Sequence, residues 1–294
     1  MLHDACPYLA DGHVQFTFRT ALDKNFQTIM IIGNIGGRRM DAKGSPVFLL
    51  GCSWRCGSTL LQRVLNSSGS IFIWGEQAGL LNGLVEPLKT LELLDGLSDR
   101  QKSRLEATAE RAWIANINPR FNDFKAAVCL MLRSIYETPT KARGIDRWGF
   151  KEVRYDAHIA RLLLDLYPNS RVIFLVRNPF DVLASNAAND WYGDIGGATG
   201  VALQWKNSCE SFLTFQDARV LLVKYEELIH SSASVLRLLS DHLSINQHTL
   251  TDAAIKVVVR GAHQPPTYGR NELEALEMLK PVAASYGYRN FSYA

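Results

Sequence analysis

The sequence lacks the features of a membrane-embedded, secreted or disulfide-stabilised protein. Its 294 residues hold no apolar run near the ~20 residues that a membrane-spanning helix needs. The first residues show no basic region followed by an apolar core, so we expect no signal peptide. The five cysteines (6, 52, 56, 129 and 209) form no C-x-x-C pair, which disfavours a metal site. An odd number of scattered thiols fits a reducing compartment, so we expect a cytoplasmic protein.

No charge of one sign is in large excess either. The formal net charge is +3, which is too small to predict nucleic-acid binding but suits a small polyanionic ligand. With 47% hydrophobic and 21% charged residues, the composition is ordinary for a globular protein. Residues 46–294 contain no linker or composition break, so we predict one domain there and an extension over residues 1–45.

The most informative stretch is PVFLLGCSWRCGSTLL, residues 46–61. The apolar run 47–50 predicts a buried strand that ends at Gly51, and helical apolar spacing resumes at Thr59. A helix start after a tight loop offers unpaired backbone N–H groups and a partial positive charge, so this segment predicts a site for a phosphate-like anion. We interpret Cys52 and Cys56, which flank the loop, as small fillers rather than redox groups.

Strands and helices then alternate along the chain. We predict strands over 70–76, 148–152, 171–176 and 220–223, and helices over 78–95, 98–116, 122–137, 156–166, from 179 and over 199–215. The second of these helices would start at a Ser98-x-x-Gln101 capping box, and the third would stop at Pro139. The alternation predicts an α/β fold of three layers, with a mostly parallel central sheet flanked by helices.

The N-terminal extension predicts an extra strand pair. Residues 13–20 alternate between polar and apolar side chains, and residues 28–32 are a second short β candidate. Such strands could cover a sheet edge or form the contact of a homodimer, and the sequence leaves both interpretations open.

An ATP-binding P-loop would need a lysine that this loop lacks. In the pattern G-x-x-x-x-G-K-[ST] the lysine follows the second glycine, whereas Ser58 follows Gly57 here. A nucleotide hydrolase also uses an aspartate at a strand end to hold Mg²⁺, but the buried strands here run into Arg177 and Lys224. A kinase-like nucleotide enzyme is therefore the weaker alternative.

Two motifs resemble those of the sulfotransferases that use 3′-phosphoadenosine 5′-phosphosulfate (PAPS). The segment Arg55-Cys56-Gly57-Ser58-Thr59-Leu60 resembles the 5′-phosphosulfate loop of that family, R-x-G-S/T-T. Arg177-Asn178-Pro179, with Ser185 eight residues after the arginine, resembles its 3′-phosphate motif. Residues 223–228, VKYEEL, are similar to a structural segment that often follows. The resemblance covers residues 46–230 and implies a P-loop NTPase-like sulfotransferase fold, with PAPS as co-substrate and no required metal.

The spacing of the second motif has a physical reason. Ser185 lies two helical turns beyond Arg177, so both can face one point at the carboxyl end of a strand. There an arginine can pair bidentately with a phosphate and a serine can donate a hydrogen bond. The alternative is an unrelated strand–glycine–helix turn with a helix-capping serine. Arg260 and Arg270 compete to complete the 3′-phosphate site, and Trp54 is the candidate to stack on adenine, with core packing as its alternative.

The acceptor side depends on Glu76 and Lys151. In carboxylate-using sulfotransferases a glutamate placed similarly after the loop is the catalytic base, so the resemblance implies this role for Glu76; a helix N-cap is the alternative. Lys151 closes its strand and is the candidate to stabilise the leaving oxygen together with Arg55. Its alternative is a surface lysine paired with Glu152 or Asp156.

The acceptor pocket is the least defined part. Trp74, Trp191 and Tyr192 are candidates for its wall, with loop anchoring as the alternative for the last two. Asp190 and Asp194 could meet a cationic or polyhydroxylated acceptor. We predict in-line transfer of a sulfuryl group from PAPS to a hydroxyl or amine of a small metabolite or natural product, without a nucleic-acid partner. A catalytically inactive phosphonucleotide-binding module is the other alternative.

Overall fold

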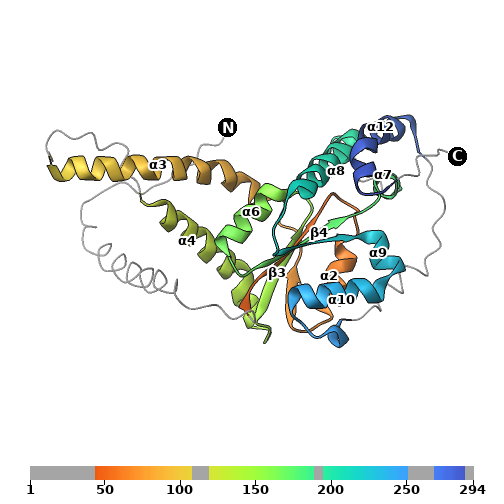
Figure 1. Ribbon diagram of the computed structural model, residues 1–294, viewed down its shortest axis with the longest axis horizontal. Helices are drawn as coiled ribbons and strands as arrows, with labels where there is room; N and C mark the ends of the chain where they lie inside the picture. The colour runs from red at the N-terminus through yellow and green to blue at the C-terminus, as the bar shows by residue number, and fades with distance from the viewer. Residues whose placement is uncertain (1–43, 108–118, 189–194, 251–267, 289–294) are drawn as a thin grey trace, which may run out of the picture. The chain divides into compact units, whose positions relative to one another are not determined.

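A computed structural model describes residues 44–107, 119–188, 195–250 and 268–288 (Figure 1). Its five strands form one sheet in the order β2-β3-β1-β4-β5, and every neighbouring pair is parallel. This confirms the predicted α/β class. The strands are β1 (Val47–Gly51), β2 (Ile71–Trp74), β3 (Arg147–Glu152), β4 (Arg171–Val176) and β5 (Val220–Lys224).

The helices that connect these strands follow the predicted alternation. The α-helices are α2 (Ser58–Asn66), α3 (Asn82–Ala107), α4 (Phe121–Leu132), α5 (Thr138–Lys141), α6 (Ala157–Leu166), α7 (Pro179–Ala187), α8 (Gly197–Thr214), α9 (Tyr225–His230), α10 (Ser232–Leu243) and α12 (Arg270–Ser285). A π-helical turn, η3 (Arg133–Glu137), and a 3₁₀ turn, η5 (Gln247–Thr249), complete the described elements.

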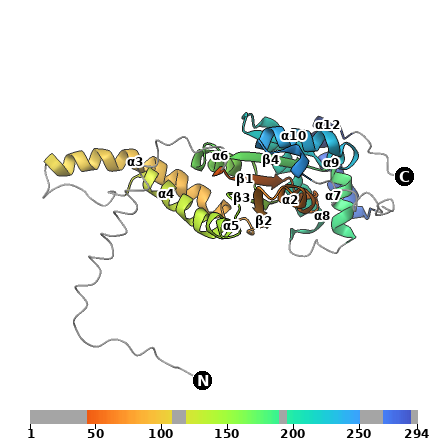
Figure 2. The same ribbon diagram turned by 90° about the horizontal axis from the view of Figure 1, so that it is seen from below.

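The sheet is covered by helices on both faces, which makes three layers. Helix α2 leads from β1 to β2, and α6 leads from β3 to β4, in opposite directions along the sheet. Because parallel crossovers are right-handed, these two helices lie on opposite faces (Figure 2). Strand β4 is followed by α7 and α8, which lead to β5 in the same direction along the sheet as α6 does. Neighbours β1 and β4 are therefore followed by helices on different faces, and α/β sheets bind their ligands at the carboxyl ends of strands at such a switch point.

The core is centred on β1, which every other part of the sheet surrounds. All five of its residues are buried, and it pairs with β3 on one side and β4 on the other. Its apolar run fits this position because a central parallel strand meets helices on both faces. Phe48 packs against the rings of Trp148 and Phe150 in β3, with ring centroids 5.9 and 4.9 Å away.

Two predicted helix boundaries are wrong. The helices expected over 78–95 and 98–116 share one continuous helix, α3, so Ser98 lies inside a helix and does not begin one. A single weak helix former costs about 1 kcal/mol at most, which is too little to stop a helix that is held elsewhere. Pro139 does not end the 122–137 helix, because it lies in the first turn of α5, where a missing N–H costs nothing.

The N-terminal prediction lies outside the described residues. By internal contacts the chain divides into Met1–Arg39 and Met40–Ala294. The strands predicted over 13–20 and 28–32 fall in the first unit, so the extra strand pair stays a prediction. Within the described ranges, no helix is both long enough and apolar enough to cross a membrane.

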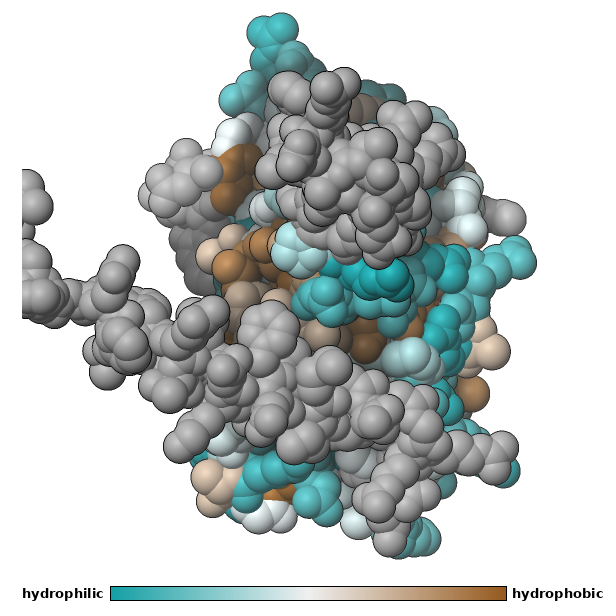
Figure 3. All heavy atoms as spheres, turned by 90° about the vertical axis from the view of Figure 1, so that its left-hand side faces the viewer, coloured by the Kyte–Doolittle hydropathy of each residue, from teal (hydrophilic) through white to brown (hydrophobic). Residues whose placement is uncertain are grey.

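A few large apolar side chains are exposed on the described helices. They include Leu93 of α3, Leu130 of α4 and Ile135 of η3. On the face in Figure 3, apolar surface lies beside hydrophilic side chains. Single exposed apolar residues are common on monomeric proteins, so these do not predict a partner by themselves.

Gly149 provides a test of this sheet. It lies opposite Val47, and a Cβ added there would come 1.6 Å from the carbonyl oxygen of Val47. The backbones of β1 and β3 cannot move apart here without breaking the hydrogen bonds that pair the two strands. We expect Gly149→Ala to lower the free energy of unfolding by more than about 3 kcal/mol.

The control is Gly83→Ala in α3, where nothing lies within 4 Å of the added Cβ. Alanine has a higher helix propensity than glycine, so the free energy of unfolding of this variant should stay within about 1 kcal/mol of the wild-type value. Denaturant titrations measure both variants. Equal stability of the two would contradict the tight β1–β3 approach.

Candidate functional site

The loop between β1 and α2 is folded by two residues with left-handed backbone. Arg55 has φ 62° and Gly57 has φ 92°. A Cβ on Gly57 would lie 2.2 Å from the ring of Tyr225, at the start of α9, so the ring lies directly over the glycine. Gly57 immediately precedes α2. The predicted strand–loop–helix is confirmed. The first backbone N–H groups of α2 lie at its loop end, which is a geometry suited to an anion.

The two motifs that are far apart in the sequence contact each other directly. Arg177 Nη1 donates a hydrogen bond to the carbonyl oxygen of Arg55 at 2.9 Å. Arg55 Nε donates to Ser185 Oγ at 3.0 Å. The carboxyl end of β4, the last turns of α7 and the β1–α2 loop therefore meet at one point, as the spacing of Arg177 and Ser185 predicts.

Among the described residues, an aromatic ring and one distant carboxylate lie beside the guanidinium of Arg177. Its guanidinium carbon lies 4.3 Å from the ring centre of Tyr225. The side chain of Asp181, 44% exposed, reaches Nη2 at 3.9 Å. Within the described part of the chain, Nε of Arg177 is buried and has no hydrogen-bond partner. This guanidinium is positioned rigidly while its charge is poorly compensated, which suits it to an anion.

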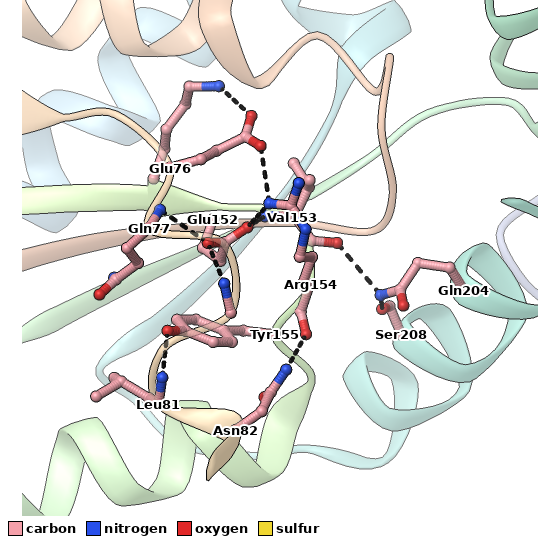
Figure 4. A network of polar contacts seen from close by, with 12 residues as sticks. Glu76, Gln77, Leu81, Asn82, Glu152, Val153, Arg154, Tyr155, Gln204 and Ser208 are labelled. Carbon is pink, nitrogen blue, oxygen red and sulfur yellow. Dashed lines mark hydrogen bonds and ion pairs between the residues drawn. The ribbon is translucent and has the colours of Figure 1, made fainter. Parts of the chain in front are cut away.

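Glu76 and Lys151 form the second part of the site. Lys151 Nζ lies 2.7 Å from Glu76 Oε1, and Arg154 Nη1 lies 3.0 Å from Glu76 Oε2 (Figure 4). The Lys151 side chain is only 8% exposed, and its partner is neither Glu152 nor Asp156, so the surface-lysine alternative is wrong. The N-cap alternative for Glu76 does not apply, because α3 begins at Asn82.

Glu152 is a carboxylate that the sequence does not identify as part of the site. Its side chain is completely buried at the end of β3. One oxygen accepts hydrogen bonds from the backbone N–H groups of Gln77 and Gly79, at 3.0 and 2.9 Å. The other accepts from the N–H of Val153 and from Arg154. Arg154 therefore lies between two carboxylates (Figure 4), one of them Glu76.

The aromatic candidates have different surroundings. Trp54 is half-buried, and the guanidinium carbon of Arg154 lies 5.3 Å from its ring centre. Trp74 Nε1 donates to Thr140 Oγ1 at 2.8 Å and to the carbonyl oxygen of Tyr136 at 3.2 Å. The indole of Trp74 therefore ties β2 to the helical turns η3 and α5.

The other predicted residues are either exposed on the surface or outside the described ranges. Arg270 is the first residue of α12, its side chain is 90% exposed, and it pairs with Glu274. Asp190, Trp191, Tyr192, Asp194 and Arg260 fall in segments that are not described. Their roles stay predictions.

The loop cysteines are buried thiols. Burial, followed by a hydrogen bond with Cys209, raises the pKa of Cys52 well above its usual value. For Cys56 the largest cause of a raised pKa is its hydrogen bond with Cys52, followed by burial. A thiol that stays protonated is unreactive, so both residues fit their predicted role as fillers behind the loop. Any anion contact of Cys56 would come from its backbone.

Three residues of the site were missed in the sequence. Glu152 and Arg154 follow Lys151 directly, and charged residues at the end of a buried strand were the available signal. Tyr225 lies in the segment interpreted as structural, and its packing on Gly57 depends on a contact that no local pattern encodes.

Comparisons with known proteins identify the family of this chain. Residues 46–249 match a family model described as Sulfotransferase family. No curated protein sequence matches the chain. The sulfotransferase domain of the Synechococcus PCC 7002 olefin synthase is a similar solved structure, with 20% identity, a TM-score of 0.43, and coverage of 83% of this chain and 98% of that domain.

Two further solved structures are similar at low identity. Sulfotransferase STF1 from Mycobacterium tuberculosis H37Rv has 14% identity and a TM-score of 0.47, covering 90% of this chain and 81% of its own. Mouse sulfotransferase SULT7A1, complexed with PAP, has 14% identity and a TM-score of 0.42, covering 83% of this chain and 85% of its own. The family model spans well over half of the residues and includes β1 through β5. The chain therefore belongs to the sulfotransferase family.

Proposed function

We propose that this sulfotransferase uses PAPS as donor and transfers its sulfuryl group to a hydroxyl or amine of a small molecule. One observation carries the proposal, namely the direct contact of Arg177 with the Arg55 carbonyl oxygen and of Arg55 with Ser185. Two groups suited to anions are thereby joined at the carboxyl ends of neighbouring strands. A nucleotide with phosphate groups on both its 3′ and 5′ positions matches such a pair.

The two ends of the donor would be bound by different means. The N-terminus of α2 and Arg55 would bind the 5′-phosphosulfate, through backbone N–H groups of Gly57, Ser58 and Thr59 and the helix dipole. Arg177 and Ser185 would bind the 3′-phosphate. The arginine is supported by the Tyr225 ring at 4.3 Å, so little side-chain freedom is lost on binding.

The Glu76–Lys151 pair supports an in-line displacement. Glu76 would take the proton of the acceptor O–H or N–H as the new bond to sulfur forms. The sulfur–oxygen bond to the 5′-phosphate breaks, and its electron pair leaves with that phosphate. Lys151 and Arg55 would balance the charge on the leaving oxygen. Glu76 is 30% exposed, so an acceptor can reach a carboxylate that already contacts Lys151.

The donor proposal is tested by thermal unfolding with nucleotides. We expect 3′-phosphoadenosine 5′-phosphate to stabilise the wild-type protein more than ATP or AMP does, by about 2.7 kcal/mol at 100 times its dissociation constant. Arg177→Ala should lose this stabilisation. Arg237→Ala, an exposed arginine on α10, is the control and should keep it. An equal response to ATP would contradict PAPS as the donor.

The base is tested by transfer of radiolabelled sulfate from PAPS to a panel of small metabolites, with and without EDTA. We expect Glu76→Gln to lower kcat by about 10²- to 10⁴-fold, because a positioned base contributes this much. The control is Glu86→Gln, a surface carboxylate paired with Lys89. If Glu76→Gln turns over normally while Arg55→Ala abolishes transfer, the base lies elsewhere. Transfer that persists in EDTA would exclude a metal-dependent, kinase-like reaction.

A further inference from the structure

The turn that follows Glu76 has an unfavourable backbone. Ala78 has φ 54° and Gly79 has φ 74°, so two consecutive residues adopt the left-handed conformation. This region is sterically unfavourable for any residue with a Cβ, and alanine has no side-chain polar group to compensate. Strained backbone of this kind persists only where its surroundings hold it. The structure must therefore contain a group that fixes residues 77–79.

That group is the carboxylate of Glu152. It accepts the backbone N–H groups of Gln77 and Gly79 on a single oxygen, at 3.0 and 2.9 Å. Backbone N–H groups on both sides of a left-handed residue converge into a concavity that binds anions. Here that anion is the carboxylate of Glu152 itself. Figure 4 shows Glu152 between Gln77 of the turn and the residues that follow it in sequence, Val153 and Arg154.

The burial of Glu152 needs an explanation beyond stability. A completely buried carboxylate is costly unless it is fully paired, and an apolar side chain in its place is often as stable. Glu152 meets this demand with three backbone N–H groups and Arg154 Nη1, the last at 2.7 Å. The same Arg154 nitrogen reaches Glu76 Oε2 at 3.0 Å. The buried Glu152 carboxylate therefore contacts both the backbone that follows Glu76 and Arg154, the cation that pairs with the Glu76 side chain.

The turn contacts the end of β3 from two sides. Lys151 and Glu152 are adjacent in β3, so their side chains leave opposite faces of the sheet. Glu76 contacts Lys151, while the residues just after it contact Glu152. A shift of the turn would move Glu76 relative to Lys151.

We propose that Glu152 is a positioning residue. It holds the turn 77–79 and the Arg154 guanidinium so that the Glu76 carboxylate stays beside Lys151, and it does not touch substrate. The kinetic part of this inference rests on the proposed role of Glu76 as base. The structural part, that Glu152 maintains the strained turn, stands independently.

The kinetic test compares Glu152→Gln with wild type. We expect kcat to fall about 10²-fold, because small misplacements of a catalytic group cost this much. The KM for PAPS and the thermal shift with 3′-phosphoadenosine 5′-phosphate should stay unchanged, since Arg55, Arg177 and Ser185 are not altered. The matched control is Glu137→Gln, a mostly buried carboxylate between Arg133 and Lys141, which should leave kcat unchanged.

The structural test is a double-mutant cycle with Ala78→Gly, read by the unfolding midpoint. Glycine relieves left-handed strain, so Ala78→Gly should raise the midpoint of the wild-type protein. The gain should disappear in the Glu152→Gln background, where the turn is no longer held in that conformation. If Glu152→Gln does not fold, Arg154→Met replaces it in the kinetic test and should lower kcat with the nucleotide shift retained.

The possible failures are distinguishable. A wild-type protein that neither transfers sulfate nor responds to the nucleotide overturns the proposed function, while the cycle still tests the turn. Unchanged kcat in Glu152→Gln, or in Arg154→Met where the former does not fold, overturns the positioning role. The positioning role is also overturned if the same variant loses both kcat and the thermal shift with 3′-phosphoadenosine 5′-phosphate. Additive midpoints in the cycle overturn the claim that Glu152 holds the turn.

Discussion

The hydrogen bond from Arg177 to the carbonyl oxygen of Arg55 is the interaction on which the site depends. It joins the segments that follow β1 and β4, although Arg55 and Arg177 are 122 positions apart in the chain. Parallel pairing makes this possible, because it places the carboxyl ends of both strands at the same edge of the sheet. Tyr225, the residue that follows β5, then packs on Gly57 and on Arg177 together, so one ring contacts both the loop and the strand-end arginine. The loop and the strand-end arginine thus form one rigid unit.

The same edge carries the charge balance around Glu76. Its carboxylate lies between Lys151 and Arg154, and Arg154 also pairs with the buried Glu152. A chain of alternating charges keeps each side chain in one geometry, because moving any member leaves another unpaired in a partly buried setting. Preorganised charges of this kind do not need to reorganise during a reaction, which is the physical advantage of building the site on strand ends.

Local patterns predicted the parts of the fold that depend on local physics. The apolar runs of β1 and β4 and the glycine before α2 carry their signal within a few residues, and so does the spacing of Arg177 and Ser185. The predicted breaks at Ser98 and Pro139 failed because tertiary support outweighs a weak propensity. Glu152 and Arg154 had only a weak signal, as charged residues at a strand end, and their contacts with the turn after Glu76 and with Glu76 itself come from another part of the chain.

Positive charge at a strand does not by itself mark the site, as two other arginines demonstrate. Arg147 and Arg171 lie at the amino ends of β3 and β4, and they donate to the carbonyl oxygens of Leu243 and His242, at the end of α10. Burial, and then repulsion from Arg171, lowers the pKa of Arg147 to about 10. The carbonyl end of a helix carries partial negative charge, so it compensates these guanidiniums. Arg177 instead donates to the carbonyl oxygen of Arg55, in the loop just before α2. The amino end of a helix carries partial positive charge, so this surrounding suits an anion.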